Sequence, residues 1–290
     1  MMGRIEMKLS SQQLEAFAEV VKTGSFSKAA KNLFITQSAL SQRVKNLETE
    51  LETGLIIRDP SGLKVTTSGE ELLRYCRVTD SLETEVLSRI QSDQRVVGGN
   101  LRIAGLSSVI RSVAMPSIDQ LIRKYSEVNI ELSSRELRDL PRVLSNNEAD
   151  FILTTSQPHR QEVVSHQIGY EENVLIESTE NTKRKNIYLD HDSEDLTTVG
   201  FFDLNKKQNK EFRRNFLDEI YTIISGVKLG WGRAVVPKHL IKKEEGIRLV
   251  RGFKPLKTPV MLQYFRQPFY SMLHDRVMGE ICKNAAKILG

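Results

Sequence analysis

The chain has 290 residues, of which 39% are hydrophobic and 27% are charged, a composition typical of soluble globular proteins rather than disordered or fibrous ones. This length predicts two or three domains. The formal net charge of +5 permits a polyanionic partner but does not require one. The sequence contains no apolar run of about 18 residues and no apolar N-terminal segment of the signal-peptide kind. We therefore expect a cytoplasmic protein without a membrane partner.

Three helices are predicted near the N-terminus. Apolar residues recur at helical spacing from Ser11 onward, and Gly24 ends this first helix. Ser25 then supplies the N-cap of a short second helix that extends to about Leu33. After a short break, Thr36 caps a third helix with the sequence TQSALSQRVKNLETEL. Its apolar residues again share one face, so we expect that face to pack inward and the polar face to stay outside.

A pair of short strands is predicted after the third helix. The segments 55–57 and 63–66 are strand-like, and the turn-forming residues 59–62 lie between them. Three helices followed by a two-stranded wing predict a winged helix-turn-helix domain. A helix of about 23 residues then begins at residue 67 and carries an apolar stripe. A second copy of the same helix is the simplest partner for this stripe, and packing within its own chain is the alternative.

The remainder of the chain alternates strands and helices after a predicted hinge at Gly98-Gly99. This alternation predicts an α/β domain with a largely parallel sheet, in which two crossing strands lead into a second lobe. The predicted strands are 101–104, 128–133, 150–154, 163–168, 173–177, 187–189, 233–236 and 260–265, and the predicted helices are 109–125, 140–145, 219–229 and 271–289.

The third helix and its surroundings have the chemistry of a DNA-reading element. Between Lys22 and Leu47 the sequence carries five basic residues and no acidic one. Short polar side chains stand at the N-terminal end of the helix, where a helix in the major groove reads base edges. Gln37 is suited to a bidentate pair with adenine, and lysines such as Lys28 and Lys45 are suited to phosphates. A solvated surface position is the alternative for any one of these residues, but the whole arrangement with its wing indicates DNA binding.

Residues 9–69 resemble the DNA-binding domain of LysR-type transcriptional regulators. The long helix and the two-lobed remainder match the layout of that family too, so the resemblance covers nearly the whole chain. It implies a cytoplasmic homodimer or homotetramer whose C-terminal domain is similar to a periplasmic binding protein and binds a small inducer. The order Ser41-Gln42-Arg43 further resembles the subgroup that regulates lysine and arginine export. The matching motifs are LEAF from Leu14, GSF from Gly24, AA at Ala29-Ala30, SALS from Ser38, LE at Leu47-Glu48 and TTSG from Thr66.

The resemblance also bears on individual residues. Most members place Arg directly after the serine at position 41, whereas Gln42 intervenes here, so Gln42 and Arg43 are both candidates for the base contact. Arg58 and Lys64 in the wing correspond to positions that usually meet the DNA backbone or the minor groove. The predicted DNA-binding residues are Ser25, Lys28, Thr36, Gln37, Ser38, Ser41, Gln42, Arg43, Lys45, Arg58 and Lys64.

The resemblance places an effector between the two lobes. Ser107 and Ser108 follow the first strand and are suited to a carboxylate, although a helix cap without a ligand is equally consistent with the pattern. Thr154 and Thr155 end another strand, at the edge where open α/β sheets bind ligands. Glu136 suits a cationic ligand, and a surface salt bridge is its alternative role. An effector that is a basic amino acid requires further acidic groups, which the sequence alone does not place.

No cofactor, metal or catalytic motif stands out. Asp190-His191-Asp192 carries metal-ligating side chains, but the tripeptide favours a polar loop, and no metal site is predicted. Gly230-Trp231-Gly232 lacks the strand and helix that flank a phosphate-binding loop. No nucleophile is paired with a base, so the chain is not expected to be an enzyme, and no cofactor is expected.

These features together predict a sequence-specific DNA-binding transcription regulator controlled by a small-molecule effector, for which an amino acid is one candidate. Its expected partners are double-stranded DNA with an inverted-repeat operator, a small molecule, further copies of the chain and, as a candidate, RNA polymerase. The alternative is a small-molecule binding protein whose N-terminal helices only oligomerise it, and deletion of residues 1–69 discriminates the two. Three domains are predicted: a winged helix-turn-helix at 1–68, a linker helix for dimerisation at 69–97 and an effector-binding domain at 98–290. Within the effector-binding domain, lobe one covers about 98–168 and 266–290, and lobe two covers about 169–265.

Overall fold

The computed structural model describes residues 9–59, 62–91, 97–158, 160–180, 183–206, 213–267 and 269–289. The chain forms two compact units, which are described separately. The N-terminal unit contains Met1–Gln94 together with Ser145–Asn147, and the C-terminal unit contains Arg95–Leu144 and Glu148–Gly290. None of the helices in the described ranges has the length and apolar character needed to cross a membrane.

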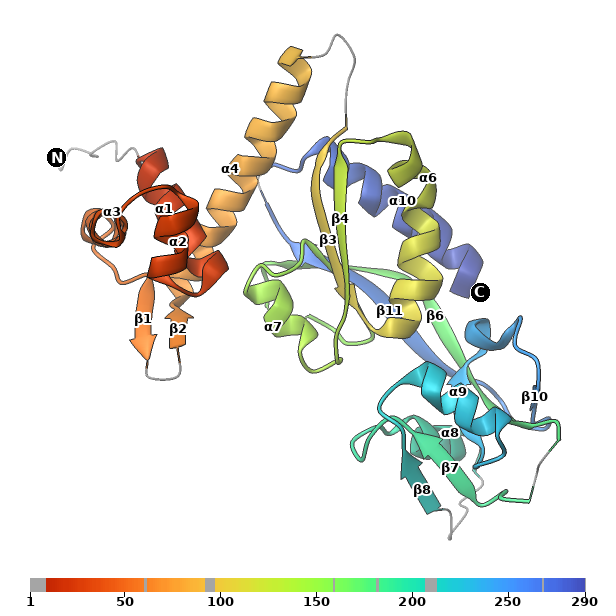
Figure 1. The fold of residues 1–290 in the computed structure, drawn as a ribbon. Helices are drawn as coiled ribbons and strands as arrows, with labels where there is room; N and C mark the ends of the chain where they lie inside the picture. The colour runs from red at the N-terminus through yellow and green to blue at the C-terminus, as the bar shows by residue number, and fades with distance from the viewer. Residues whose placement is uncertain are drawn as a thin grey trace. The chain divides into compact units, whose positions relative to one another are not determined.

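The N-terminal unit is the predicted winged helix-turn-helix followed by a long helix (Figure 1). The predicted helix boundaries are confirmed: Gly24 takes a left-handed conformation with φ 64° after the first helix, and Ser25 and Thr36 are the N-caps of the next two. Glycine adopts this conformation without the steric cost of a Cβ. The elements of this unit are α1 (Ser11–Thr23), α2 (Phe26–Asn32), α3 (Gln37–Glu50), β1 (Ile56–Asp59), β2 (Gly62–Val65) and α4 (Thr67–Gln91).

Apolar side chains hold α1, α2, α3 and the start of α4 together. Leu40 and Val44 of α3 pack with the alanines of α2, while Leu47 packs with Phe17 of α1 and with α4. The wing is tied to α3 because the Glu48 carboxylate accepts hydrogen bonds from the backbone N–H groups of Leu55 and Ile56, at 2.8 and 3.2 Å. This packing leaves the outer face of α3 free for another role.

The C-terminal unit is built on one seven-stranded sheet with a small two-stranded sheet beside it. The strand order of the large sheet is β10-β6-β11-β5-β3-β4, with β9 also paired to β6. The strands of this unit are β3 (Gly99–Gly105), β4 (Val128–Ser134), β5 (Phe151–Thr154), β6 (Val163–Ser178), β7 (Ile187–Asp190), β8 (Arg213–Phe216), β9 (Ala234–Pro237), β10 (Ile247–Leu249) and β11 (Leu256–Phe265). The helices are α5 (Ser107–Val109), η1 (Ile110–Ala114), α6 (Met115–Lys124), α7 (Leu140–Ser145), α8 (Thr197–Leu204), α9 (Ile220–Lys228), η2 (Lys238–Ile241) and α10 (Met272–Leu289).

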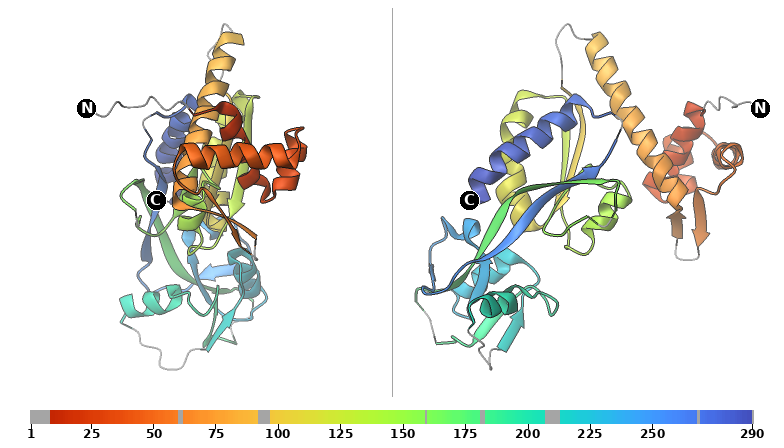
Figure 2. Two further views of the ribbon diagram at one scale, coloured as in Figure 1. Left: turned by 90° about the vertical axis from the view of Figure 1, so that its left-hand side faces the viewer. Right: turned by 180° about the vertical axis from the view of Figure 1, so that it is seen from behind.

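The expectation of a largely parallel sheet is wrong. Among the described residues of the large sheet, only β3 makes parallel pairs, with β4 and with β5, whereas β11 runs antiparallel to both β5 and β6. The small sheet of β7 and β8 is parallel. The two predicted strands 163–168 and 173–177 are one continuous strand, β6, which pairs along its length with β11. These two long strands pass from one lobe into the other (Figures 1 and 2). The first lobe contains β3–β5, α5–α7 and α10, the second contains β7–β10, α8 and α9, and β6 and β11 belong to both.

Both faces of the first-lobe sheet are buried. Ile103 and Phe151 face the core that α6 and α10 cover, while their neighbours Ala104 and Ile152 face α7. This is why the strands appear in the sequence as continuous apolar runs rather than alternating ones. The predicted helix 109–125 is also interrupted, because residues 110–114 form a π-helical segment between α5 and α6. Three further elements, α8, β8 and β10, were not predicted from the sequence.

Candidate nucleic-acid interface and lobe junction

The N-terminal end of α3 is fixed by its cap. The Thr36 hydroxyl accepts a hydrogen bond from the backbone N–H of Ala39 at 3.2 Å and lies 3.0 Å from the Ser38 hydroxyl. Such a cap satisfies one of the free N–H groups of the first turn. On the inner side of the helix, Leu40 and Leu47 are fully buried. The direction of the outer side chains is therefore set by a packed and capped helix.

The outer face of α3 is polar and accessible. Its exposed residues include Gln37 and Gln42, and Ser41 and Arg43 are partly buried at its side. The Gln42 amide nitrogen donates to the Asn46 side-chain oxygen at 2.7 Å, which joins two successive turns of the same face. Amide and hydroxyl groups of this kind are the ones that hydrogen-bond base edges in the major groove. The exposed predicted residues of this face are Thr36, Gln37, Ser38, Gln42 and Lys45.

The other predicted DNA-binding residues lie on α2 and on the wing. Lys28 is exposed, and its backbone N–H donates to the hydroxyl of the N-cap Ser25 at 3.4 Å. On β2, the Lys64 ammonium lies 2.8 Å from an Asp59 carboxylate oxygen. The structure pairs Arg58 with Leu63 in the wing, but the side chain of Arg58 lies outside the described part of the chain.

Phe34 is a feature of this domain that the sequence analysis treated only as a break between helices. It has a positive φ of 54°, which is uncommon for a bulky residue, and it is 96% exposed. The conformation follows from the tight turn that joins α2 to the cap of α3. A Gly or Asn at this position is the usual signal for such a turn. Because Phe34 is neither, the positive φ was not predictable from the sequence.

The two lobes of the C-terminal unit touch through Ser107. Its hydroxyl, at the end of β3, donates to Glu219 Oε1 in the second lobe at 3.0 Å. The other Glu219 oxygen accepts the backbone N–H groups of Tyr221 and Thr222 and so caps α9. Beside this contact, the guanidinium of Arg111 lies 4.4 Å above the Tyr221 ring. One carboxylate thus both caps a helix of one lobe and holds the other lobe.

Ser108 points to a second acidic group, Glu171 of β6. The two side-chain oxygens are 3.4 Å apart, and burial raises the pKa of Glu171 from 4.5 to about 7. His239 Nε2 lies 3.6 Å from Glu171 Oε1, and burial lowers the pKa of His239 to about 4. That ring nitrogen has no hydrogen-bond partner among the described residues. The junction therefore holds a buried carboxyl with a pKa of about 7 beside a buried imidazole that is neutral at that pH.

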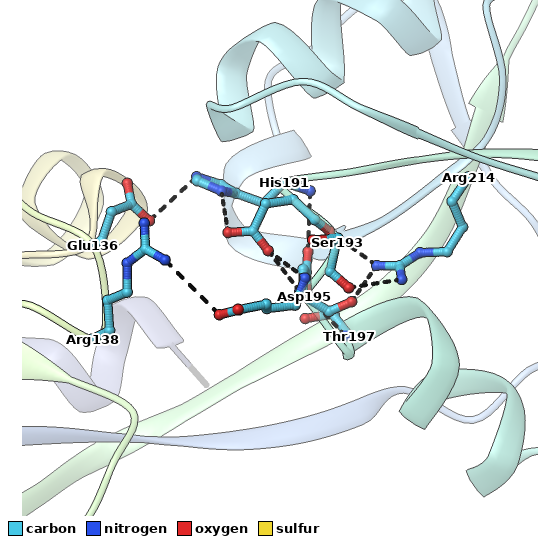
Figure 3. A network of polar contacts seen from close by, with 9 residues as sticks. Glu136, Arg138, His191, Ser193, Asp195, Thr197 and Arg214 are labelled. Carbon is cyan, nitrogen blue, oxygen red and sulfur yellow. Dashed lines mark hydrogen bonds and ion pairs between the residues drawn. The ribbon is translucent and has the colours of Figure 1, made fainter.

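The remaining predicted effector residues are dispersed. Glu136 faces the second lobe, where its carboxylate lies 3.9 Å from His191 Nε2 (Figure 3). Thr154 is buried, with its hydroxyl 3.0 Å from that of Ser156, and Thr155 is partly buried. Three junction residues, Glu171, Glu219 and His239, were not predicted from the sequence. Glu219 directly precedes an apolar helical segment, and its capping role was predictable from that position.

Comparison with known proteins identifies the family. Residues 11–70 match the model of the bacterial regulatory helix-turn-helix proteins of the lysR family, and residues 94–268 match the LysR substrate binding domain. The chain belongs to the LysR family. The order of its domains, a helix-turn-helix before a two-lobed substrate-binding domain, is that of a LysR-type regulator.

Relatives of this LysR-type chain include the HTH-type transcriptional regulator HdfR of Yersinia enterocolitica, which is 27% identical over 162 residues, 56% of this chain and 55% of the relative. HdfR of Yersinia pestis matches with the same identity and coverage. The matched region thus spans about half the length of these relatives.

Several solved structures share the fold over nearly the whole chain. ArgP from Mycobacterium tuberculosis has a TM-score of 0.77 and 21% identity, covering 97% of this chain and 99% of its own. Full-length LysG from Corynebacterium glutamicum with bound effector Arg has a TM-score of 0.74 and 19% identity, covering 96% and 98%. A full-length OxyR variant from Pseudomonas aeruginosa has a TM-score of 0.69 and 16% identity, covering 98% and 99%. At these identities the likeness concerns the fold.

Proposed function

We propose that this protein is a sequence-specific transcription regulator that inserts α3 into the major groove of double-stranded DNA. The observation that carries the proposal is the outer face of α3, where exposed Gln37 and Gln42 stand on a capped helix with a fully buried inner face. The major groove is about 12 Å wide and admits one α-helix. Lys28 and Lys45 then contact phosphates, and Arg43 stands beside Gln42 as a base or phosphate contact.

The proposed DNA-bound form is a homodimer or homotetramer on an inverted-repeat operator. Along α4, Val86, Leu87 and Ile90 are more than half exposed, although apolar side chains at helical spacing normally pack against a partner. A second α4 provides that partner. Two linked DNA-binding domains gain avidity over one without any new contact. RNA polymerase in the cytoplasm is the proposed further partner.

The effector is proposed to bind at the lobe junction, within the domain that begins at about residue 98. Ser107 and Ser108 already hydrogen-bond across this junction, to Glu219 and Glu171. Glu219 supplies a carboxylate for a basic amino acid, and Glu171, with a pKa of about 7, can ionise beside a bound cation. These two groups support the proposed subgroup of lysine and arginine responsive regulators. Glu136, Thr154 and Thr155 complete the proposed effector residues. Binding there shifts the population of lobe arrangements and so the spacing of the DNA-binding domains.

The test is a DNase I footprint with the purified protein on the DNA upstream of its own and neighbouring genes. We expect two protected half-sites related by an inverted repeat, and an affinity that falls steeply with added salt because phosphate contacts release counterions. Addition of arginine or lysine is expected to change the protected pattern. A uniform or salt-insensitive interaction, or no protection at any upstream region, contradicts the proposal.

A further inference from the structure

Three side chains of types that can ligate metal ions converge at the lobe junction, in a cluster that does not include Ser107 or Ser108. Glu136 follows β4 in the first lobe, His191 follows β7 in the second, and Asp218 follows β8. One ligand atom from each lies within 4.8 Å of the ligand atoms of the other two. The three residues are far apart in the sequence and come from three different segments, so local chain geometry does not explain their meeting.

Hydrogen bonding does not explain it either. The contact between Glu136 and His191 Nε2 is 3.9 Å, beyond hydrogen-bonding distance. Within the described ranges, no hydrogen bond engages the side chains of Glu136, His191 or Asp218. Two carboxylates this close repel each other unless a cation lies between them. A divalent cation bound by all three groups removes that repulsion and gives each a partner.

Of the two second-lobe ligands, His191 stands on a loop that is held in place independently of any ion (Figure 3). Arg214 pairs with the buried Asp190 and donates to the carbonyl oxygens of Asp192 and Ser193, at 3.2 and 3.3 Å. The backbone N–H of His191 donates to Asp195 Oδ2 at 3.2 Å. This bonding fixes the position of the His191 backbone, and a ligand that is already in place binds a metal with a smaller loss of conformational entropy.

A carboxylate also stands near the other ring nitrogen of His191. His191 Nδ1 lies 4.0 Å from an Asp192 carboxylate oxygen, which is longer than a hydrogen bond. In metal sites a carboxylate that hydrogen-bonds this nitrogen orients the ring, and Asp192 is the group in position to do so when the ion binds. Nε2 is the nitrogen that faces Glu136.

We propose that Glu136, His191 and Asp218 form a divalent metal site that joins the two lobes, with zinc as the best match to one imidazole and two carboxylates. Zinc bonds of about 2.1 Å require ligand atoms about 3.4 Å apart in a tetrahedron, so the side chains move together by roughly 1 Å, with water as the fourth ligand. Because the ligands come from both lobes, the bound ion stabilises the arrangement in which the lobes meet. This gives the regulator a second input, separate from the proposed organic effector.

The test is zinc binding to the EDTA-stripped full-length protein, measured by equilibrium dialysis at pH 7. We expect one zinc per chain that the Glu136→Gln, Asp218→Asn and His191→Ala variants each bind at least tenfold more weakly. Glu194→Gln is the matched control, because Glu194 is an exposed carboxylate of the same loop, outside the three-residue cluster. It is expected to bind zinc as the wild type does.

Two further measurements keep the outcome decisive. Circular dichroism without zinc checks that the variants are folded. Glu136→Gln and Asp218→Asn conserve side-chain size, so the zinc affinities of these two variants decide the test if His191→Ala does not fold. The chain has two cysteines, Cys76 and Cys282, which are also able to bind zinc. Cobalt substitution separates the cluster from them, because thiolate ligands add intense charge-transfer absorption that nitrogen and oxygen ligands lack. Equal zinc affinity in wild type and cluster variants, an equal loss in Glu194→Gln, or thiolate absorption overturns the proposal. No DNA is present, so this result is independent of the footprint.

Discussion

Replacement of Glu171 by Gln is expected to remove a pH-dependent loss of stability from the C-terminal unit. Glu171 is only 5% exposed, and burial raises its pKa from 4.5 to about 7. The folded state therefore keeps the proton in a range of pH where the unfolded chain has already released it. By linkage, the stabilisation that this proton gives is largest below pH 4.5 and is lost as the pH rises through 7.

The magnitude follows from the two pKa values. A difference between 4.5 and about 7 corresponds to about 3 kcal/mol over the full range, at 1.36 kcal/mol for each unit. Between pH 5.5 and 8.5 the wild type loses about 2 kcal/mol of that sum. For a unit of this size, about 2 kcal/mol shifts the melting temperature by roughly 4–8 °C. Glu171→Gln keeps an acceptor for Ser108 but cannot ionise, so it escapes this loss.

The assay is thermal unfolding of the full-length protein at pH 5.5 and 8.5, followed for the transition of the C-terminal unit. At each pH the melting temperature of wild type is subtracted from that of Glu171→Gln. This difference is expected to be larger at pH 8.5 than at pH 5.5 by roughly 4–8 °C. Glu172→Gln is the control for loss of one negative charge, because the neighbouring Glu172 is in ion pairs with Lys238 and Lys257. If the difference between wild type and Glu171→Gln is the same at both pH values, the burial argument is refuted.

The remaining predictions concern one position in each unit. Burial lowers the pKa of His274 from 6.5 to about 4, so the unfolded chain binds a proton that the folded state excludes, and stability falls as the pH drops from 6.5 to 4. His274→Phe keeps a ring beside Phe151. Its free energy of unfolding, measured with urea, is expected to fall less between pH 6.5 and pH 4 than that of the wild type. An equal fall in both proteins rules out His274 as the source. In the first turn of α4, a Cβ at Gly69 meets the Leu55 carbonyl oxygen at 2.4 Å, so Gly69→Ala is expected to lower the melting temperature of the N-terminal unit. The destabilisation is roughly 1–3 kcal/mol, as for overpacked sites, and an unaltered melting temperature refutes the close contact.

Local chemistry made the DNA-binding domain predictable. Gly24, Ser25 and Thr36 end or begin helices through interactions with residues no more than four positions away, and such signals are present in any short window of sequence. The two-lobed α/β character was predictable for a similar reason, because apolar runs alternate with helical patterns.

Long-range partners were not predictable in the same way. Ser107 meets Glu219 across 112 positions, and Ser108 meets Glu171 across 63, so both serines were found but neither partner was. The sheet was mistaken as largely parallel because β11 returns between β5 and β6 from the end of the chain, and a buried strand carries no mark of its direction. The continuous β6 was divided because polar residues at its middle, such as Glu171 and Glu172, interrupt the apolar pattern.

The most direct test of base reading by α3 compares two DNA duplexes, the footprinted operator and a scrambled sequence of equal length, by fluorescence anisotropy at one salt concentration. For Gln37→Ala the account predicts weaker binding to the operator by about 1–3 kcal/mol, which is roughly 5- to 150-fold in Kd, and unchanged binding to the scrambled duplex. Lys28→Ala, which removes a phosphate contact, is expected to weaken both duplexes alike. Equal losses on both duplexes for Gln37→Ala, or no loss on the operator, would contradict the claim that this helix reads the DNA sequence.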